Sequence, residues 1–273
     1  AAFNTITDIN ERFGVGPADS ILGLSSLSFD LSVYDVFGSL CAGSTLVLPE
    51  PTQSYDPDAW LELIEACSVT IWNSAPSLME LFVERLDDCG KPIPSSLRKV
   101  LLSGDWIGLA LAHRLLREQS LDLVSLGGAT EASIWSIAYC VDHLRKEWRS
   151  IPYGRSLRGQ SVFVFDERLE RCPVWAAGEI YIGGVGLARG YWRAPDQSAR
   201  SFVNHPRTGE RLFKTGDLGR YRRDGNIEIL GREDLQVKIS GHRIELAEIE
   251  FVLSQYPMVR DVVVTVLEPG EGQ

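Results

Sequence analysis

The stretch VTIWNSAPSLMELFVERLDDCGKPIPSSLRKVLLS, residues 69–103, places one amphipathic segment between two short apolar ones. The apolar segments, 69–72 and 99–102, have the length and composition of buried strands. The segment between them repeats apolar residues at the three- and four-residue spacing of a helix, namely Leu78, Leu81, Phe82 and Leu86. A strand, a helix and a second strand in this order favour a parallel sheet covered by helices.

The same alternation extends on both sides of this stretch. Strand-like runs lie at 45–48 and 123–126, and a helix is expected over 107–117. Another helix is expected to begin at Asp56, an N-cap residue followed by proline, and to carry Trp60, Leu61, Ile64 and Cys67. We therefore predict an α/β fold with a mainly parallel sheet flanked by helices. Ligands bind at the carboxyl ends of such strands, which here are Asn73, Ser103, Gly104, Asp105, Gly127 and Gly128.

The pattern changes after Ile134, where strand-like runs separated by Gly- and Asp-rich turns predict a small β-rich subdomain: 161–165, 179–182 and 226–230. The last part predicts the start of a small α+β subdomain, with a strand at 236–239, a helix carrying Leu246, Ile249 and Leu253 on one face, and an apolar run at 261–266. We accordingly divide the chain into three parts, 1–145, 146–233 and 234–273.

The composition excludes several classes of protein. The chain has 273 residues, 44% of them hydrophobic, and 27 basic against 37 acidic residues give it a net charge of −10. This acidic balance argues against nucleic-acid binding. No apolar run is long enough for a membrane span and no secretory leader is visible, so we expect a cytoplasmic protein. The sequence begins at Ala1 without a methionine, and we expect it to be a piece of a larger polypeptide.

Cysteine and histidine do not form a metal-binding pattern. No CxxC spacing occurs, and the five cysteines are predicted to be buried thiols, not a disulfide framework or a zinc site: Cys41, Cys67, Cys89, Cys140 and Cys172. The four histidines are scattered as well. The sequence also lacks the GxxxxGK[ST] phosphate loop and the GxSxG nucleophile motif, which argues against P-loop NTPases and α/β-hydrolases.

Five motifs are individually typical of turns at strand ends, but their order is specific. They are FDLS (29–32), GGATE (127–131), GEIYIGGVGLARGYW (178–192), KTGDLGRYRRDGNIEILGRED (214–234) and QVKISGHRIELAEIE (236–250). In this order and spacing they resemble the core motifs of nonribosomal peptide synthetase adenylation domains, in the superfamily of AMP-binding acyl-activating enzymes. The resemblance covers residues 19–266.

The resemblance implies a ligase that activates an amino acid with ATP. The aminoacyl-AMP would pass its acyl group to the phosphopantetheine thiol of a carrier protein, and a small MbtH-like activator protein is a further expected partner. By similarity, Glu131 would hold Mg²⁺ and Thr130 would lie near the AMP phosphate. The nucleotide would contact Gly104, Gly127, Gly128, Asp217 and Arg232, with Asp217 on the ribose hydroxyls. Asp234 would be the hinge of the C-terminal subdomain, and residues 238–243 would approach the pantetheine.

The resemblance also implies the positions that line the amino-acid pocket: Asp30, Leu31, Tyr34, Asn73, Leu101, Ser103, Leu126, Ile134 and Trp135. The string D-L-Y-N-L-S-L-I-W matches the pattern of cysteine-activating domains. Asp30 suits the substrate ammonium, a charge-assisted pair worth roughly 1.5–3 kcal/mol. A thiol loses little on entering a largely apolar wall, whereas the serine hydroxyl would be disfavoured by about 1–3 kcal/mol unless Ser103 or Asn73 offers it a partner.

The sequence departs from the family pattern in two respects. Gly127 stands where the family has an aromatic residue, so stacking of that ring on adenine is lost or supplied elsewhere. The residues given include neither the Ser/Thr/Gly-rich phosphate loop nor the final motif with its lysine, so we expect this chain alone to be a poor catalyst. Two alternatives stay open: an acyl-activating ligase for serine or another small acid, and a non-catalytic adenylation-like platform that docks carrier proteins.

Overall fold

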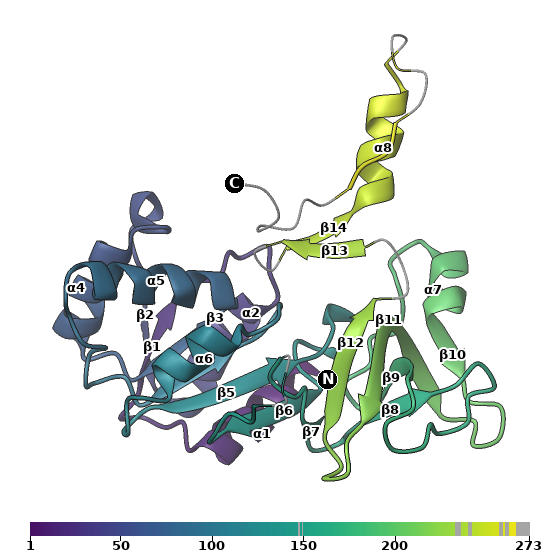
Figure 1. Cartoon of the computed structure of the whole chain (residues 1–273), viewed down its shortest axis with the longest axis horizontal. Helices are drawn as coiled ribbons and strands as arrows, with labels where there is room; N and C mark the ends of the chain where they lie inside the picture. The colour runs from purple at the N-terminus through teal and green to yellow at the C-terminus, as the bar shows by residue number, and fades with distance from the viewer. Residues whose placement is uncertain are drawn as a thin grey trace.

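The chain folds into two β-sheets that lie side by side, with a hairpin and a helix near the C-terminal end (Figure 1). The computed structural model describes residues 1–146, 148, 150–232, 236–239, 242–256, 259 and 262–265. The predicted class, α/β with a mainly parallel sheet followed by a β-rich part, is confirmed. The division at 1–145, 146–233 and 234–273 stays a prediction.

The first sheet has, within the described residues, the strand order β2-β1-β3-β4-β5-β6-β7. The pairings from β2 to β5 are parallel, and β6 and β7 are each antiparallel to the preceding strand. The bounds are Ser20–Gly23 (β1), Thr45–Val47 (β2), Ile71–Ser74 (β3), Lys99–Leu102 (β4), Asp122–Gly127 (β5), Ile137–Val141 (β6) and Arg155–Ser156 (β7). The strand predicted at 99–102 is matched, and the one predicted at 69–72 begins two residues later.

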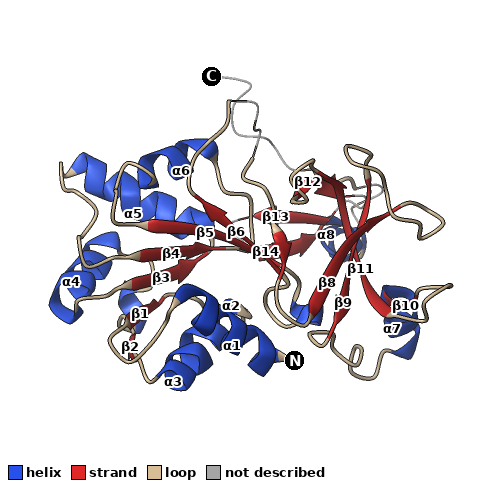
Figure 2. Ribbon diagram, turned by 90° about the horizontal axis from the view of Figure 1, so that it is seen from below, coloured by secondary structure: helices blue, strands red, loops and turns tan. Residues whose placement is uncertain are grey.

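Helices cover both faces of this sheet (Figure 2). One face carries α4 (Pro57–Cys67), α5 (Pro76–Asp88) and α6 (Leu109–Leu115), and the other carries α1 (Ala2–Phe13), α2 (Leu31–Val33) and α3 (Ser39–Ala42). Between α2 and α3 lies one π-helical turn, η1 (Tyr34–Gly38). The carboxylate of Asp56 caps α4 by accepting hydrogen bonds from the backbone N–H groups of Asp58 and Ala59, as its sequence predicts.

Alternation along the strands sends neighbouring side chains to opposite faces of the sheet. In β3, Trp72 packs under α4 and α5, whereas Ile71 packs on the α1 side. In β4, Val100 and Leu102 lie on the first side and Leu101 on the second. The continuous apolar runs of these strands therefore reflect burial on both faces.

The second sheet is antiparallel and follows the first in sequence. Its order is β10-β11-β9-β8, and β12 also pairs with β11. The bounds are Gln160–Phe165 (β8), Gly178–Gly184 (β9), Phe202–Asn204 (β10), Arg211–Tyr221 (β11) and Ile227–Arg232 (β12), with α7 (Pro195–Ser201) before β10. Buried aliphatic side chains of β8, β9 and β12 form its core together with Ala132 and Ile137 of the first part.

The C-terminal part begins with an antiparallel hairpin, β13 (Gln236–Ile239) and β14 (His242–Glu245), followed by α8 (Leu246–Ser254). Both elements project from the two sheets (Figure 1). The predicted strand and helix are confirmed here. Residues 262–265, within the apolar run at 261–266, have no regular secondary structure.

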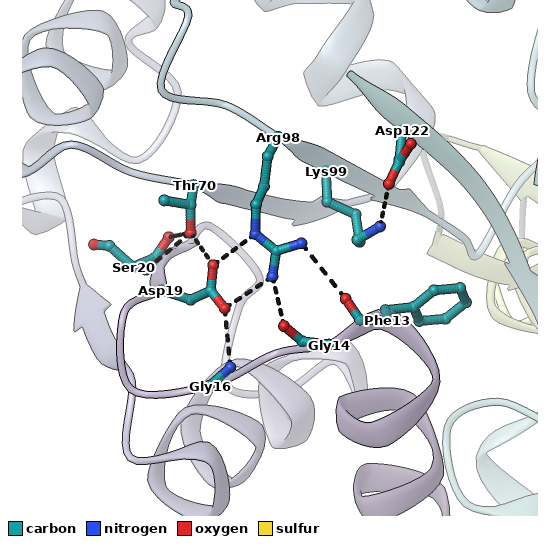
Figure 3. Close-up of polar contacts among 9 residues, drawn as sticks. All are labelled: Phe13, Gly14, Gly16, Asp19, Ser20, Thr70, Arg98, Lys99 and Asp122. Atoms are coloured by element: carbon teal, nitrogen blue, oxygen red, sulfur yellow. Dashed lines mark hydrogen bonds and ion pairs between the residues drawn. The ribbon is translucent and has the colours of Figure 1, made fainter. Parts of the chain in front are cut away.

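An ion pair ties α1 to the first sheet (Figure 3). The Arg98 guanidinium contacts both carboxylate oxygens of Asp19 at 2.8 Å and donates to the carbonyl oxygens of Phe13 and Gly14 at the end of α1. The Thr70 hydroxyl also donates to Asp19, at 2.7 Å. Burial would raise the pKa of Asp19, but these hydrogen bonds outweigh it and lower the pKa to about 2.

The predicted burial of the cysteines is wrong for four of the five. Cys172 is buried, whereas Cys41, Cys67, Cys89 and Cys140 are exposed free thiols. Three of the exposed thiols lie in or at the ends of helices and one on β6. Cys67 was expected on the apolar face of its helix, but it is the last residue of α4 and lies beyond the buried turns. Among the described residues, no helix is both long and apolar enough to cross a lipid bilayer.

Candidate functional site

A cavity of about 650 Å³ opens where the ends of β4 and β5 meet the second sheet. This volume is in the range of small-molecule sites. The wall is made by the segments after β4 and β5, by residues 29–31 and 150–153, and by side chains of β11 and β12. Five of the six predicted strand-end residues line this cavity, because parallel strands bring their carboxyl ends to one edge of the sheet, whereas Asn73 does not line it.

Asp30 lines this cavity just before α2. Its Oδ2 accepts a hydrogen bond from the Thr130 hydroxyl at 2.6 Å, so two predicted residues one hundred positions apart are in direct contact. A carboxylate has several acceptor sites and can bind further donors while it holds this hydroxyl. The pair offers fixed negative charge at the cavity wall.

Glu131 follows Thr130 in a short 3-10 turn, η3 (Thr130–Ala132), and also lines the cavity. The Tyr191 hydroxyl donates to Glu131 Oε1 at 2.6 Å, and the Ala188 backbone N–H donates to the Glu131 carbonyl oxygen at 2.7 Å. The two motifs GGATE and GLARGYW are therefore held together through Glu131. Tyr191 was not predicted as a site residue.

The backbone directly after η3 is strained. Ser133 and Ile134 have φ angles of 67° and 73°, in the left-handed region that a β-branched residue rarely adopts. Such a conformation costs about 1–3 kcal/mol and persists where the surroundings enforce it, often at binding sites. It directs the chain so that Ile134 and Trp135 both line the cavity.

Asp217 and Arg232 form an ion pair in the second sheet. Their side chains are mostly buried, Arg232 Nη1 lies 2.7 Å from Asp217 Oδ1, and the two residues are directly opposite in the β11–β12 register. The pairing between β11 and β9 shifts between Lys214 and Leu218, a bulge of the kind that re-aims side chains. Both partners line the cavity, and their role as a ribose-binding pair stays a prediction.

Six of the nine predicted pocket residues line the cavity: Asp30, Leu31, Ser103, Leu126, Ile134 and Trp135. The other three, Tyr34, Asn73 and Leu101, are fully buried and support these residues from inside the core. The Tyr34 ring lies 5.0 Å from the Trp135 ring, Asn73 Nδ2 lies 3.5 Å from the Leu31 carbonyl oxygen, and Leu101 belongs to the same apolar cluster.

The polar groups of this region are largely engaged with one another. The Trp135 indole N–H donates to Ser103 Oγ at 2.9 Å, and Asn73 Nδ2 donates to Asp35 Oδ1 at 2.7 Å. Asn73 Oδ1 is buried and accepts no hydrogen bond from the described residues. Burial raises the pKa of Asp35 to about 7, against the lowering effect of hydrogen bonds from Asn73 and Ser25. Asp35 was not predicted as part of the site.

The family model described as "AMP-binding enzyme" matches residues 1–192. The chain belongs to the family of AMP-binding enzymes.

Relatives of this AMP-binding enzyme include nonribosomal peptide synthetases. It is 52% identical to pyochelin synthetase PchF of Pseudomonas aeruginosa over 98% of the chain, but it spans only 15% of the length of that relative. The structure of the nonribosomal peptide synthetase FmoA3 in its α-methyl-L-serine-AMP bound form matches with a TM-score of 0.81 and 44% identity over 85% of this chain and 26% of that one. NpsA-ThdA from Klebsiella oxytoca, an artificially fused adenylation–PCP di-domain, matches with a TM-score of 0.85 and 29% identity over 97% of this chain and 53% of that one.

Neighbouring residues of this AMP-binding enzyme pack so closely that only glycine fits at positions 127 and 128. A Cβ atom on Gly128 would lie 2.8 Å from backbone atoms of Ile134, Trp135 and Ser136, and one on Gly127 would lie 1.6 Å from Tyr153 Cε2. The sequence suggested that the pair lets the backbone approach a ligand; the structure adds that the protein itself fills both side-chain positions. Gly104, the third predicted glycine, also lines the cavity, with φ +87°.

Two predictions about the C-terminal part of the AMP-binding enzyme concern residues that the structure describes only in part or not at all. The hinge residue Asp234 is not described, and of the segment 238–243 the backbone of Lys238, Ile239, His242 and Arg243 is described as part of β13 and β14. The roles assigned to these residues stay predictions.

Proposed function

We propose that the chain is the adenylation unit of a nonribosomal peptide synthetase, which activates an amino acid with ATP and passes it to a carrier protein. One observation carries the proposal: a single cavity is lined both by the Asp30 carboxylate and by the Asp217–Arg232 pair. The first suits an ammonium group and the second suits ribose hydroxyls. A relative with an AMPPNP-bound form, and another fused to a carrier domain, support ATP and a carrier protein as partners.

Asp30 would bind the α-ammonium of the substrate. The Thr130 hydroxyl fixes one oxygen of the carboxylate, so an ammonium meets an oriented acceptor and less rotational freedom is lost on binding. An ammonium–carboxylate contact of this kind is worth roughly 1.5–3 kcal/mol.

In the proposed reaction, a carboxylate oxygen of the amino acid attacks the α-phosphorus of ATP and the bond to pyrophosphate breaks. No protein nucleophile is needed, so the work of the chain is positioning and charge stabilisation. Glu131, held by the Tyr191 hydroxyl, would contribute one carboxylate to Mg²⁺. This fits the ion, which is commonly bound by one or two carboxylates together with substrate phosphates and supplies charge neutralisation there.

Cysteine is the proposed substrate. The wall near Asp30 is mostly apolar, and its polar groups are partly engaged: Ser103 Oγ accepts from Trp135, and the Asn73 amide group donates to Asp35. A thiol, a weak hydrogen-bonding group, loses little in such surroundings. Serine is the second candidate, because the Ser103 hydroxyl lines the cavity and offers a hydrogen-bonding group, and a relative is bound to α-methyl-L-serine-AMP.

The roles of the C-terminal part extend this proposal. Asp234 would be the hinge, residues 238–243 would approach the phosphopantetheine of the carrier protein, and an MbtH-like protein would be an accessory partner. The first two roles follow from the resemblance of the motifs at 214–234 and 236–250 to those of adenylation domains, and the accessory partner follows from the resemblance to that family as a whole.

Calorimetric titration with non-hydrolysable aminoacyl-adenylate analogues tests the proposal. We expect the cysteinyl analogue to bind roughly tenfold more tightly than the seryl one, consistent with 1–3 kcal/mol of discrimination. Asp30→Asn should weaken the cysteinyl analogue roughly tenfold to a hundredfold, and should leave an analogue lacking the α-amino group unchanged.

Thr130→Val is the matched control for Asp30→Asn, because it removes the hydroxyl and keeps the carboxylate. We expect it to weaken the cysteinyl analogue by a smaller factor. If Asp30→Asn weakens the cysteinyl analogue and the analogue lacking the α-amino group equally, no ammonium is recognised. A folded chain that binds none of the analogues would contradict the adenylation activity.

A further inference from the structure

The ring of Tyr153 occupies the position that a side chain at residue 127 would take. A Cβ atom on Gly127 would lie 1.6 Å from Tyr153 Cε2, 2.4 Å from Cζ and 2.5 Å from Cδ2. No other residue is among the three nearest atoms at this position. The phenol ring, which comes from the segment between β6 and β7, therefore replaces in space the side chain that the end of β5 lacks.

Several contacts hold this ring in place. The Tyr153 backbone N–H donates to the Ile227 carbonyl oxygen of β12 at 2.8 Å, and the side chain packs against the apolar core of the second sheet. Burial raises the pKa of Tyr153, and the nearby Asp217 carboxylate raises it further by a smaller amount. A backbone hydrogen bond with Gly128 acts in the opposite direction and lowers it. The ring is thus fixed between the end of β5 and the strand pair that carries Asp217 and Arg232.

The ring is also accessible from the cavity. Tyr153 is partly buried and lines the cavity together with Gly127, Gly128 and Asp217. A rigid aromatic surface beside a carboxylate–guanidinium pair is suited to a nucleoside, because the base can stack on the ring while the sugar hydroxyls reach the charged pair.

We propose that Tyr153 provides the surface on which the adenine base stacks, in place of a side chain at position 127. The inference rests on the proposed function, since it takes adenosine as the bound nucleoside. It assigns a binding residue from outside the GGATE motif to the nucleotide site.

The test is AMP binding to the chain by calorimetry, with ribose 5-phosphate as a probe that lacks the base. Tyr153→Leu keeps apolar bulk and removes the aromatic face, and we expect it to weaken AMP roughly tenfold or more. Tyr153→Phe keeps the face and should stay within about threefold of the original chain. Neither variant should change the affinity for ribose 5-phosphate.

A ring exchange keeps the inference testable if Tyr153→Leu folds poorly. Gly127→Phe alone should abolish AMP binding, because its side chain collides with Tyr153. In the double variant Gly127→Phe/Tyr153→Ala the ring returns to position 127, and AMP should bind more tightly than to Tyr153→Ala alone. Circular dichroism in the near ultraviolet reports whether each variant is folded.

The outcomes separate the two proposals. If the original chain binds AMP and neither Tyr153→Leu nor the ring exchange alters its affinity, the role of Tyr153 is wrong and the adenylation proposal stands. If the folded original chain binds neither AMP nor an aminoacyl-adenylate analogue, both are overturned.

Discussion

The Asp35 carboxylate shows how a single buried residue can support a binding wall without lining it. It is 2% exposed and accepts the Asn73 amide N–H, and Asn73 in turn contacts the backbone of Leu31, which lines the cavity. Burial raises its pKa to about 7, so the folded chain retains a proton that an exposed aspartate would have lost.

This raised pKa predicts how stability depends on pH. Between about pH 4, the pKa of an unfolded aspartate, and pH 7, the folded chain binds more protons at Asp35 than the unfolded chain does. The stabilising contribution is therefore complete below about pH 4 and is lost as the pH rises through about 7. Relative to Asp35→Asn, which cannot ionise, the free energy of unfolding should fall by up to about 1.4 kcal/mol per pH unit in this window.

Urea unfolding at several pH values between 4 and 8 measures this difference. Asp88→Asn removes an exposed carboxylate at the end of α5 and should show the same pH dependence as the original chain. Parallel curves for the original chain and Asp35→Asn would contradict the prediction.

At the scale of elements, the Arg98–Asp19 pair joins the C-terminal end of α1 to the segments before β1 and β4 (Figure 3). The last carbonyl groups of a helix lack partners within the helix. Arg98 satisfies those of Phe13 and Gly14 and simultaneously neutralises Asp19, whose side chain is 8% exposed.

Replacing Arg98 with Met should therefore destabilise the chain by about 2–3 kcal/mol, somewhat less than the loss of one partner of a fully buried pair. Arg85→Met is a matched control, because Arg85 makes the same two-pronged contact with Asp58, at 2.8 Å, on an exposed surface. Exposed pairs contribute about 0–1 kcal/mol. Urea unfolding of both variants measures the difference, and equal losses would show that burial of the Arg98 pair adds nothing.

At the scale of the whole molecule, an arginine between two tryptophans joins the two sheets. The Arg222 guanidinium lies 5.5 Å from the ring of Trp148 and 5.6 Å from that of Trp175, and it is 7% exposed. Trp148 belongs to the core of the first sheet, while Arg222 follows β11 in the second. A buried cation between aromatic faces is well placed to resist separation of the sheets that enclose the cavity.

Arg222→Met should lower the free energy of unfolding by roughly 1–3 kcal/mol, the range expected for two partly desolvated cation–π contacts. Calorimetric unfolding should then show a broader or divided transition as the sheets become less coupled. The adjacent Arg223 is exposed, so Arg223→Met serves as the control and should unfold like the original chain. An unchanged, single transition in Arg222→Met would argue that other contacts hold the sheets together.

The sequence by itself determined the parallel sheet, because each strand from 69 to 126 carries enough apolar residues to be buried on both faces and each intervening helix has an amphipathic pattern. It also placed Asp30, Thr130, Glu131, Asp217 and Arg232 in one site through the order of the motifs, and all five line the cavity. It did not indicate the antiparallel strands β6 and β7, whose apolar patterns are short or interrupted. The helix α1 was missed as well, although Ile6, Ile9 and Phe13 follow helical spacing.

Only the tertiary structure decided which side chains meet. The occupation of the Gly127 position by Tyr153, the burial of Asp35 against Asn73, and the contact of Tyr191 with Glu131 join residues 26, 38 and 60 positions apart. No periodicity or spacing encodes such pairs, since they depend on how separate elements pack. For the same reason the comparison with the family motif predicted only that Gly127 lacks an aromatic ring, while the packing places the Tyr153 ring in the side-chain position of Gly127.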